Sequence, residues 1–311
     1  MQNNLELRTS RRSLLKRCGL LGGVHPLLFL DRASGAIPPP ITVRDRLWLW
    51  SHVAGSYNGM YNLPGKSRMS PAEAAFYMSI PNIFMIHRDG TPEPPLQQYA
   101  LAFEPLREVV WGIVAAGGRT NPAEREMVLE LALHNPKISG VVMDDFFTIT
   151  REGKPRDGKV ASLTVEEARA LKQRLVGTKK KLDLWVVLYE YQLVPSIVEH
   201  LKLCDVVQLW TWWGENLDQL AANLEKAEKL VRGTRMALGL YWWDFGNKKP
   251  LAMSAMQHQC DLGLQWLRQG RIEGMIFCGN WLCDRGLDVV EWTRQWIQRV
   301  GSEKVPSRER G

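Results

Sequence analysis

Apolar runs alternate with amphipathic stretches along almost the whole chain after residue 40. Each run ends near an aromatic or polar residue, and apolar positions at helical spacing usually follow it. Eight units of a strand followed by a helix are what a closed (β/α)₈ barrel requires. The pattern therefore predicts one α/β barrel whose strands lie within residues 46–55, 80–87, 108–116, 138–147, 182–191, 205–213, 235–244 and 272–281.

The stretches between the runs carry helix signals. Ser70 and Asn121 each precede a proline, which fits a capping residue followed by proline in the first helical turn. Thr164 with Glu167 fits a capping box. Together with the apolar spacing, these signals predict helices over residues 121–135, 163–175, 217–231 and 251–269, and another that starts after Ser70.

The runs are almost continuously apolar, as in WVVLYEY and GMIFCG. Such runs suit parallel strands covered on both faces, so an antiparallel sandwich is disfavoured. The length fits one barrel of roughly 250 residues, and we predict one domain over residues 37–311 without a linker. Residues 148–162, rich in glycine and charge, are expected to form an exposed excursion after the fourth strand.

The first 36 residues have a different character. The sequence TSRRSLLK resembles a twin-arginine export signal, an apolar stretch follows, and small residues at 33–36 offer a cleavage site. We predict a cleavable signal over residues 1–36, the twin-arginine translocation machinery as a partner, and a periplasmic or extracellular location without a stable membrane anchor. The alternative is a basic cytoplasmic tail.

Charge and cysteines narrow the function classes. The net charge of +7 falls to +3 after residue 36, because residues 1–36 hold six Lys and Arg against two Asp and Glu. The remaining charge is dispersed, which disfavours a nucleic-acid partner. No two cysteines form a CxxC pair, so a structural zinc site is not expected. A twin-arginine substrate folds in the reducing cytoplasm before export, so disulfides are not expected either. No motif calls for a cofactor.

Chemistry in such barrels gathers where the strands end. Carboxylates recur at the predicted ends, and paired carboxylates cleave glycosidic bonds. Tryptophans recur there too, and their faces stack on the apolar faces of sugars. Both features point to a carbohydrate substrate. The candidate catalytic residues are Asp144, Asp145, Glu190 and Asp244, and the candidate substrate-binding residues are His52, Tyr57, His87, Tyr191, Trp212, Glu215, Trp243, Asn280 and Trp281.

The sharpest motif is GVVMDDFF at residues 140–147. Adjacent residues of a strand face opposite sides, so one aspartate is expected to point into the mouth and the other toward the helices or a loop amide. We expect Asp145 to face the mouth, with Asp144 as a supporting carboxylate. The alternative for either residue is a cap on the next turn.

Glu190 and Asp244 also follow apolar runs. A carboxylate buried there has a raised pKa, which suits a general acid. Ion pairs are the alternatives, with Arg88 for Glu190 and with a lysine at 248 or 249 for Asp244. Glu215 lies farther along, and we expect it on a loop.

The histidines indicate a function less clearly than the carboxylates do. His52 and His87 would converge with an aspartate in a metal-dependent hydrolase, but the first strand lacks the His-x-His pair that such barrels usually carry. Hydrogen bonding to substrate or a neutral structural role is favoured for both histidines. No GxSxG elbow, Walker loop or GxGxxG fingerprint occurs.

Five segments carry a family resemblance: SRRSLLK, VVMDDFF, VVLYE, GLYWWDFGNKKP and GMIFCGNWLCD. The chain resembles secreted bacterial proteins of the glycoside-hydrolase-like TIM-barrel superfamily over residues 40–300. The resemblance implies a TIM barrel and a carbohydrate substrate. Neither the DxxDxDxE motif of chitinase-like barrels nor an Asn-Glu dyad at the fourth strand is present.

The first hypothesis is an exported glycoside hydrolase in which Asp145, Glu190 and Asp244 supply the acid and the nucleophile or base. The second is a noncatalytic carbohydrate-binding barrel, in which the carboxylates only hydrogen-bond sugar hydroxyls. The third is the metal-dependent hydrolase. Two carboxylates facing each other across the mouth would favour the first hypothesis.

Overall fold

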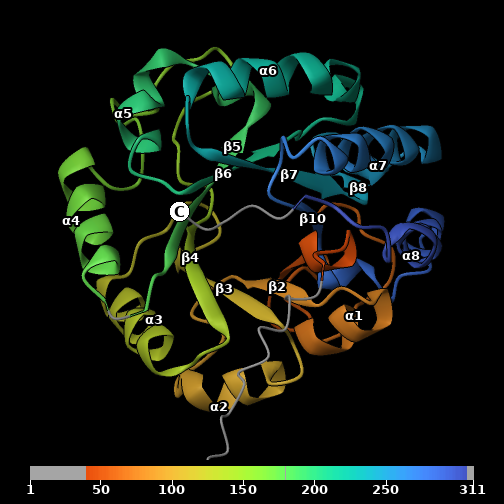
Figure 1. The fold of residues 1–311 in the computed structure, drawn as a ribbon, viewed down its shortest axis with the longest axis horizontal. Helices are drawn as coiled ribbons and strands as arrows, with labels where there is room; N and C mark the ends of the chain where they lie inside the picture. The colour runs from red at the N-terminus through yellow and green to blue at the C-terminus, as the bar shows by residue number, and fades with distance from the viewer. Residues whose placement is uncertain (1–39, 179, 307–311) are drawn as a thin grey trace, which may run out of the picture. The chain divides into compact units, whose positions relative to one another are not determined.

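The computed structural model describes residues 40–178 and 180–306. Eight parallel strands close into a barrel in the order β1-β10-β7-β6-β5-β4-β3-β2, and helices surround it (Figure 1). All eight predicted strands are confirmed, and the predicted export signal lies outside the described residues. The barrel strands are β1 (Leu47–Ser51), β2 (Asn82–Met85), β3 (Glu108–Val114), β4 (Ile138–Met143), β5 (Asp183–Tyr189), β6 (Val206–Trp210), β7 (Arg235–Tyr241) and β10 (Met275–Cys278).

The predicted helix starts are also confirmed. Ser70 and Thr164 each form a capping box, with Glu73 and Glu167, and the Asn121 side chain accepts from two backbone N–H groups. None of the described helices is long and apolar enough to span a bilayer. The helices are α1 (Pro71–Met78), α2 (Leu96–Ala100), α3 (Pro122–His134), α4 (Val165–Val176), α5 (Val198–Leu201), α6 (Leu220–Leu230), α7 (Met253–Arg268) and α8 (Asp288–Val300).

Two details differ from the expected pattern. The seventh strand ends at Tyr241, and Trp243–Asp244 instead forms β8, which pairs antiparallel with β9 (Lys249–Pro250). The sixth helix starts late, because Gly214–Gln219 forms a 3-10 helix before α6. The excursion after β4 is confirmed, since isolated bridges join Phe147 to Ala161 and Ile149 to Pro155 and most of the segment between is exposed.

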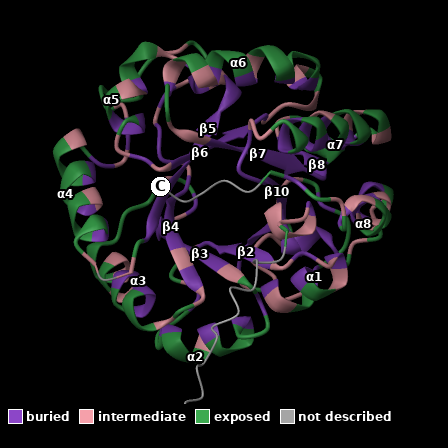
Figure 2. Cartoon of the chain, viewed as in Figure 1, coloured by how far each residue is buried: buried purple, intermediate pink, exposed green. Residues whose placement is uncertain are grey.

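Most residues of the barrel strands are buried (Figure 2). Aromatic side chains fill the inside of the barrel. The ring of Trp48 lies 5.0 Å from Phe84 and 5.6 Å from Trp185, measured between centroids. One layer higher, Trp50 lies 5.4 Å from Phe84 and 5.5 Å from Trp210. Gly239 makes room for Trp210, because a Cβ at that glycine would come within 1.9 Å of the indole ring. The interior is a packed core, and Trp50 and Trp210 form its top.

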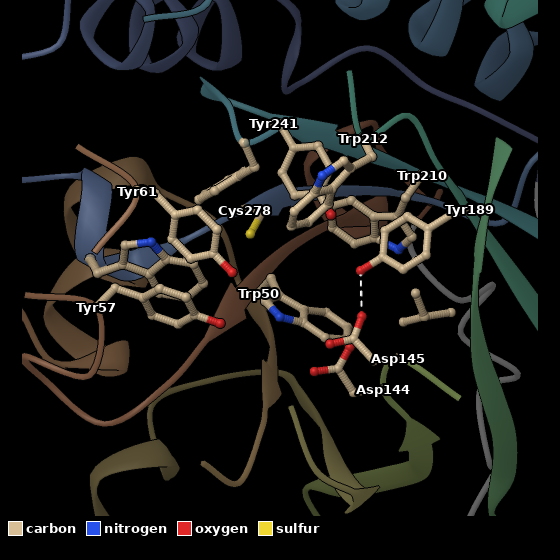
Figure 3. A pocket seen from close by; sticks show the side chains of 13 residues that line it. Trp50, Tyr57, Tyr61, Asp144, Asp145, Tyr189, Trp210, Trp212, Tyr241 and Cys278 are labelled. Atoms are coloured by element: carbon tan, nitrogen blue, oxygen red, sulfur yellow. Dashed lines mark hydrogen bonds between the residues drawn. The ribbon is translucent and has the colours of Figure 1, made fainter. Parts of the chain in front are cut away.

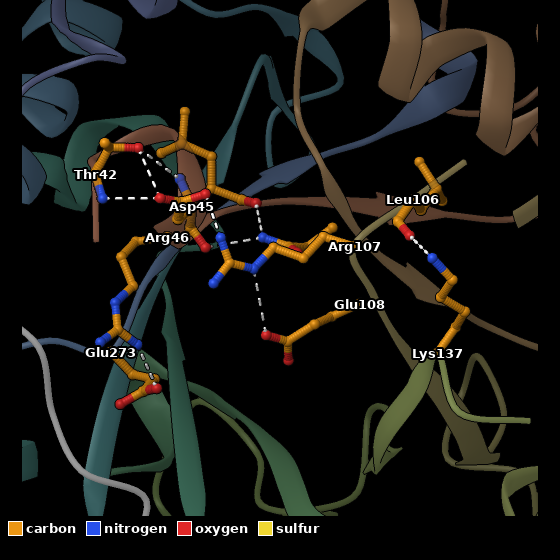
Figure 4. Close-up of polar contacts among 10 residues, drawn as sticks. Thr42, Asp45, Arg46, Leu106, Arg107, Glu108, Lys137 and Glu273 are labelled. Atoms are coloured by element: carbon orange, nitrogen blue, oxygen red, sulfur yellow. Dashed lines mark hydrogen bonds and ion pairs between the residues drawn. The ribbon is translucent and has the colours of Figure 1, made fainter. Parts of the chain in front are cut away.

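Ion pairs close the opposite, amino-terminal end of the barrel (Figure 4). Arg46 Nη1 lies 2.7 Å from Glu273 Oε1, and Arg235 Nη1 lies 3.6 Å from the same oxygen. Arg107 pairs with Asp45. Charged groups at this end therefore neutralise one another where the strands begin, which is the end that contributes stability in such barrels.

Candidate active site

A pocket opens at the carboxyl ends of the strands, directly above Trp50 and Trp210 (Figure 3). Its cavity volume is about 50 Å³, so the side chains leave a narrow opening. The lining residues are Trp50, Tyr57, Tyr61, Asp144, Asp145, Val187, Tyr189, Trp210, Trp212, Tyr241, Phe245, Cys278 and Trp281.

Asp144 and Asp145 both line this pocket, which corrects the expectation that they would face opposite sides. The alternation holds only within a strand, and β4 ends at Met143. Asp145 adopts a left-handed backbone conformation with φ 45°, so the chain turns as it leaves the barrel. The turn brings two consecutive carboxyl groups to the same wall.

Two neutral donors hold the Asp145 carboxylate in place. The Tyr189 hydroxyl donates to Oδ1 at 2.6 Å, and the backbone N–H of Gly117 donates to Oδ2 at 2.8 Å. Gly118 packs against the same turn at φ +68°, where a Cβ would come within 2.6 Å of the Asp145 carbonyl oxygen. The Gly117-Gly118 pair after β3 therefore shapes the site, and the expectation of a loop amide contact is met by Asp145 itself.

Asp144 has a different environment. Its side chain is buried, and burial followed by the charge of Asp145 raises the pKa of Asp144 well above its usual value. The charge of Arg88 opposes this rise. A raised pKa favours the protonated form of a carboxyl group, which is the form that donates a proton.

Stacked aromatic rings form the wall across from the carboxylates. Tyr57 stacks on Trp281 with centroids 4.2 Å apart and planes at 14°, and Arg88 lies over the Tyr57 ring at 4.4 Å. Trp212 stacks on Phe245 at 5.7 Å. Burial is the largest cause that raises the pKa of Tyr57 well above its usual value, so this hydroxyl stays protonated. The wall offers ring faces and neutral hydroxyls.

Glu190 and Asp244 do not line the pocket. Glu190 begins a 3-10 helix after β5, and its carboxylate accepts from Trp212 N and Asn216 Nδ2, each at 3.0 Å. Burial raises the pKa of Glu190, as its sequence position suggests, and these hydrogen bonds lower it in part. Glu190 therefore shapes the loop that carries Trp212, and Arg88 is not its partner.

Asp244 holds a turn. Its two oxygens accept from Asn247 N at 3.1 Å and Asn247 Nδ2 at 2.9 Å. The predicted ion pair with a neighbouring lysine does not form. Glu215 is exposed on the 3-10 helix before α6, as expected for a loop, and also accepts from Asn247.

His52 and Asn280 lie behind the aromatic wall. Asn280 Oδ1 accepts from His52 N at 2.9 Å, and its Nδ2 donates to the carbonyl oxygens of His52 and Met69. His52 Nε2 lies 3.5 Å from the Tyr57 hydroxyl. These residues position Tyr57, and their side chains do not line the pocket.

Trp243 and Tyr191 also support lining residues from behind, whereas His87 lies against Trp111, which does not line the pocket. Trp243 Nε1 donates to the carbonyl oxygen of Tyr61 at 3.1 Å, and Tyr191 stacks on Tyr189 at 5.6 Å. His87 Nε2 accepts from Trp111 Nε1 at 2.7 Å. Across residues 40–178 and 180–306, no three His, Cys, Asp or Glu side chains gather as metal ligands would, so the two histidines do not converge with an aspartate.

Several lining residues were absent from the sequence-based candidates: Trp50, Tyr61, Val187, Tyr189, Trp210, Tyr241, Phe245 and Cys278. Trp50 and Trp210 carry a usable signal, because they lie at the last positions of barrel strands and point inward. Tyr61 belongs to the irregular segment between β1 and α1, where periodicity gives no guide.

Comparison with known proteins finds similarity at the level of the fold. No protein-family model matches the chain, and no curated protein is similar in sequence. The catalytic domain of a hyperthermophilic chitinase from Pyrococcus furiosus matches 82% of this chain and 96% of its own length, at 12% identity and a TM-score of 0.51. The chain has a TIM-barrel fold. At this identity the likeness concerns the fold alone.

Other solved structures give weaker matches. A glycoside hydrolase family 5 enzyme from Prevotella bryantii B14 is 11% identical over 83% of this chain and 99% of that chain, with a TM-score of 0.48. A mandelate racemase/muconate lactonizing enzyme from Roseiflexus sp. is 9% identical over 78% of this chain, with a TM-score of 0.43, and the match spans 56% of its length. A fold does not determine a function, which has to be argued from the pocket.

Proposed function

We propose that the protein is a glycoside hydrolase that cleaves O-glycosyl bonds of an oligo- or polysaccharide in this pocket. The observation that carries the proposal is the pair Asp144 and Asp145, one with a raised pKa and one held by two hydrogen-bond donors, side by side in an aromatic cavity. Two carboxyl groups in different environments are the usual means of splitting acid and base roles.

Each carboxyl group has a role in this proposal. Asp144 is the general acid and gives its proton to the departing glycosidic oxygen. Asp145 stays in place through Tyr189 and Gly117, and its negative charge stabilises the positive charge that develops on the sugar ring. Because both donors to Asp145 are uncharged, its charge remains effective toward the substrate.

The aromatic rings account for binding. Trp212 and Tyr57 present ring faces on which the apolar face of a sugar can stack, and Trp281 lies behind Tyr57. The phenol of Tyr61 lies in the same cavity and can meet sugar hydroxyls, whereas the Tyr241 hydroxyl is hydrogen-bonded to Tyr189. Stacking supplies affinity, and the hydroxyls supply orientation.

A noncatalytic carbohydrate-binding protein is the second candidate. The engagement of Glu190 and Asp244 in local hydrogen bonds favours it, because these two carboxylates are then unable to face Asp145 across the mouth. In that case Asp144 and Asp145 would only hydrogen-bond sugar hydroxyls.

The test is hydrolysis of a broad oligosaccharide panel by the purified protein and by Asp144→Asn, Asp145→Asn and Glu190→Gln, with folding checked by thermal unfolding. We expect cleavage by the wild type, its loss in both aspartate variants, and its retention in folded Glu190→Gln. Sugar binding without cleavage, equal in all four proteins, would move the protein to the binding class.

We also propose export by the twin-arginine route, on the basis of the motif at residues 9–16. The test is Arg11→Lys with Arg12→Lys in the full chain, followed by fractionation of a bacterium that has this pathway. We expect the wild type outside the cytoplasm and shortened near residue 36, and the double variant retained inside at full length. Equal distribution of both proteins would contradict this route.

A further inference from the structure

A second cavity, the basal cavity, lies at the amino-terminal end of the barrel, opposite the mouth. It is formed where β5, β6 and β7 begin, and these strands are neighbours in the barrel (Figure 1). Its cavity volume is about 760 Å³, against about 50 Å³ for the pocket at the mouth. The larger volume falls in the range of small-molecule sites. The lining residues are Lys181, Lys202, Cys204, Asp205, Lys229, Leu230, Val231, Arg232, Gly233, Thr234 and Arg235.

Short connections between the outer helices and the strands bring these side chains together. Lys181 precedes β5, and the turn at residues 231–234 leads from α6 into β7. Gly233 in that turn has φ 86°, a left-handed conformation that glycine adopts without strain. The turn places Arg232 and Arg235 at the same cavity, so cations from separate connections line one hollow.

The lining of the basal cavity is strongly basic. It holds five Lys or Arg side chains and one carboxylate, Asp205. Asp205 is already paired at 2.5 Å with Lys172, a residue outside the lining. Walls that carry one sign of charge concentrate the electrostatic potential within a cavity. The basal cavity therefore attracts anions.

The positive charge of the lining is only partly compensated by the protein. Arg235 pairs with Asp183 at 2.6 Å. Lys202 pairs with Glu199 at 2.6 Å. Within the part of the chain that the structure describes, the other three cations have no carboxylate at ion-pair distance; they are Lys181, Lys229 and Arg232. Three like charges around one cavity repel one another, and an anion between them removes that repulsion.

We propose that the basal cavity binds a soluble compound that carries several phosphate groups. Phosphate suits the cations present, because a guanidinium binds it through two parallel hydrogen bonds and an ammonium binds it as a compact charge. Three unpaired cations exceed the single charge of a carboxylate or of one uronic acid ring, so linked phosphates match the cavity best. The Thr234 hydroxyl adds a further hydrogen-bond donor to the lining.

The shape and position of the basal cavity separate this ligand from other partners. The site is concave, and a flat membrane surface does not reach into it. A polyanion is not expected in the pocket at the mouth, where Asp144 and Asp145 contribute carboxyl groups to the lining. The inference therefore goes beyond the proposed glycosidase function and does not depend on it.

The probe is inorganic tripolyphosphate, and its binding to the purified full chain is measured by isothermal titration calorimetry at low and high salt. We expect one saturable site whose affinity falls as salt rises, because the contacts are ionic. Lys229→Gln and Arg232→Gln should each raise the Kd about tenfold or more through the loss of charge-assisted hydrogen bonds. Thermal unfolding checks that these exposed substitutions leave the fold intact.

Lys226→Gln is the matched control. It makes the same exchange as Lys229→Gln on an exposed position of α6, outside the lining of the basal cavity. We expect it to change the Kd less than about twofold, as for a solvated surface charge. Equal weakening in Lys226→Gln and Lys229→Gln, or no binding of tripolyphosphate to the wild type, would overturn the site.

Other anions test the class of ligand. Inorganic phosphate should bind at least about tenfold more weakly than tripolyphosphate, because it meets fewer of the three cations. Equal affinity for the two would overturn the requirement for several phosphate groups. An oligogalacturonate that binds as tightly would overturn phosphate as the ligand chemistry. Binding to phosphatidylglycerol vesicles that Lys229→Gln abolishes would overturn a soluble ligand in favour of a membrane surface.

Discussion

Among the described residues, buried carboxylates are paired with Lys or Arg at the amino-terminal end of the barrel and unpaired at its mouth. At the amino-terminal end, Glu273 meets Arg46 and Arg235, and Asp205 meets Lys172 at 2.5 Å. At the mouth, within the described residues, Asp144 and Asp145 have no Lys or Arg at ion-pair distance. The same chemical group is neutralised at one end and left reactive at the other.

This difference separates stability from chemistry. A carboxylate paired with a buried cation has its charge satisfied, and removing one partner leaves the other exposed to a large desolvation cost. A carboxyl group forced to stay protonated by burial costs stability and gains the ability to donate a proton. Mutation or a change of pH is therefore expected to affect Asp144 and Asp145 at the mouth differently from the ion-paired carboxylates at the amino-terminal end.

The largest contrast is expected in activity. Asp145→Asn should lower kcat by about 10²–10⁴, because it removes the negative charge next to the acid while preserving shape. Glu273→Gln, the matched change at the other end, should leave kcat per folded molecule unchanged. Steady-state kinetics on a cleaved glycoside measure both. An equal loss in the two variants would show that the ends do not differ in this respect.

The free energy of unfolding should fall more in Glu273→Gln than in Asp145→Asn, the reverse of the order expected for activity. Glu273→Gln leaves Arg46 without its carboxylate, whereas Arg235 keeps Asp183 at 2.6 Å, and the change should lower the free energy of unfolding by roughly 2–4 kcal/mol. Urea unfolding followed by circular dichroism measures this loss. A variant as stable as the wild type would mean that Arg46 finds another partner.

Asp144→Asn should stabilise the protein as pH rises. The pKa of Asp144 is higher in the folded protein than the value of 3.8 for the unfolded chain. Between these two pKa values the folded protein keeps a proton that the unfolded chain releases. The stability of the wild type therefore falls as pH rises from the unfolded pKa through the folded one. Asparagine avoids this cost, which amounts to about 1.4 kcal/mol for each tenfold difference in proton affinity between the folded and unfolded protein.

Urea unfolding of wild type and Asp144→Asn at about pH 3.5 and about pH 7.5 measures this dependence, because only the higher value lies above the unfolded pKa of aspartate. The two proteins should be similar in acid and the variant more stable at neutral pH. A variant that is less stable at both values would show that Asp144 stabilises the fold.

The smallest effect belongs to Asp45. Burial raises its pKa, but hydrogen bonds from Thr42 and the charge of Arg107 outweigh burial and hold the pKa below its usual value. Stability from this carboxylate is therefore present above the unfolded pKa and lost as pH falls through the folded one. Because the group is largely solvated, Asp45→Asn should cost less than about 1 kcal/mol at neutral pH and nothing in strong acid. Thermal unfolding at the two pH values checks this.

Local signals in the sequence were sufficient for the barrel. Continuous apolar runs marked every barrel strand, and the capping residues Ser70, Asn121 and Thr164 marked helix starts, because both signals depend on neighbours in the chain. The burial of Glu190 also follows from its apolar run. Features set by nearby residues are readable without a structure.

The direction of side chains beyond the strand ends was not readable. Asp145 has a left-handed backbone conformation, which breaks the alternation of side chains. Glu190 begins a 3-10 helix, and its carboxylate accepts from Asn216. Asp244 belongs to β8, which pairs antiparallel with β9. Each depends on contacts with another loop. Tyr61 reaches the pocket from an irregular segment, where its place depends on Trp243.

The most direct test of the contrast is a titration of the aspartate carboxyl carbons by ¹³C NMR in the wild type, Asp144→Asn and Asp145→Asn. We predict one carboxyl with a pKa well above the usual range, its absence in Asp144→Asn, and its return toward the usual range in Asp145→Asn, where the neighbouring charge is gone. A wild type in which every aspartate titrates in the usual range would contradict the account of the mouth as a site with a protonated acid.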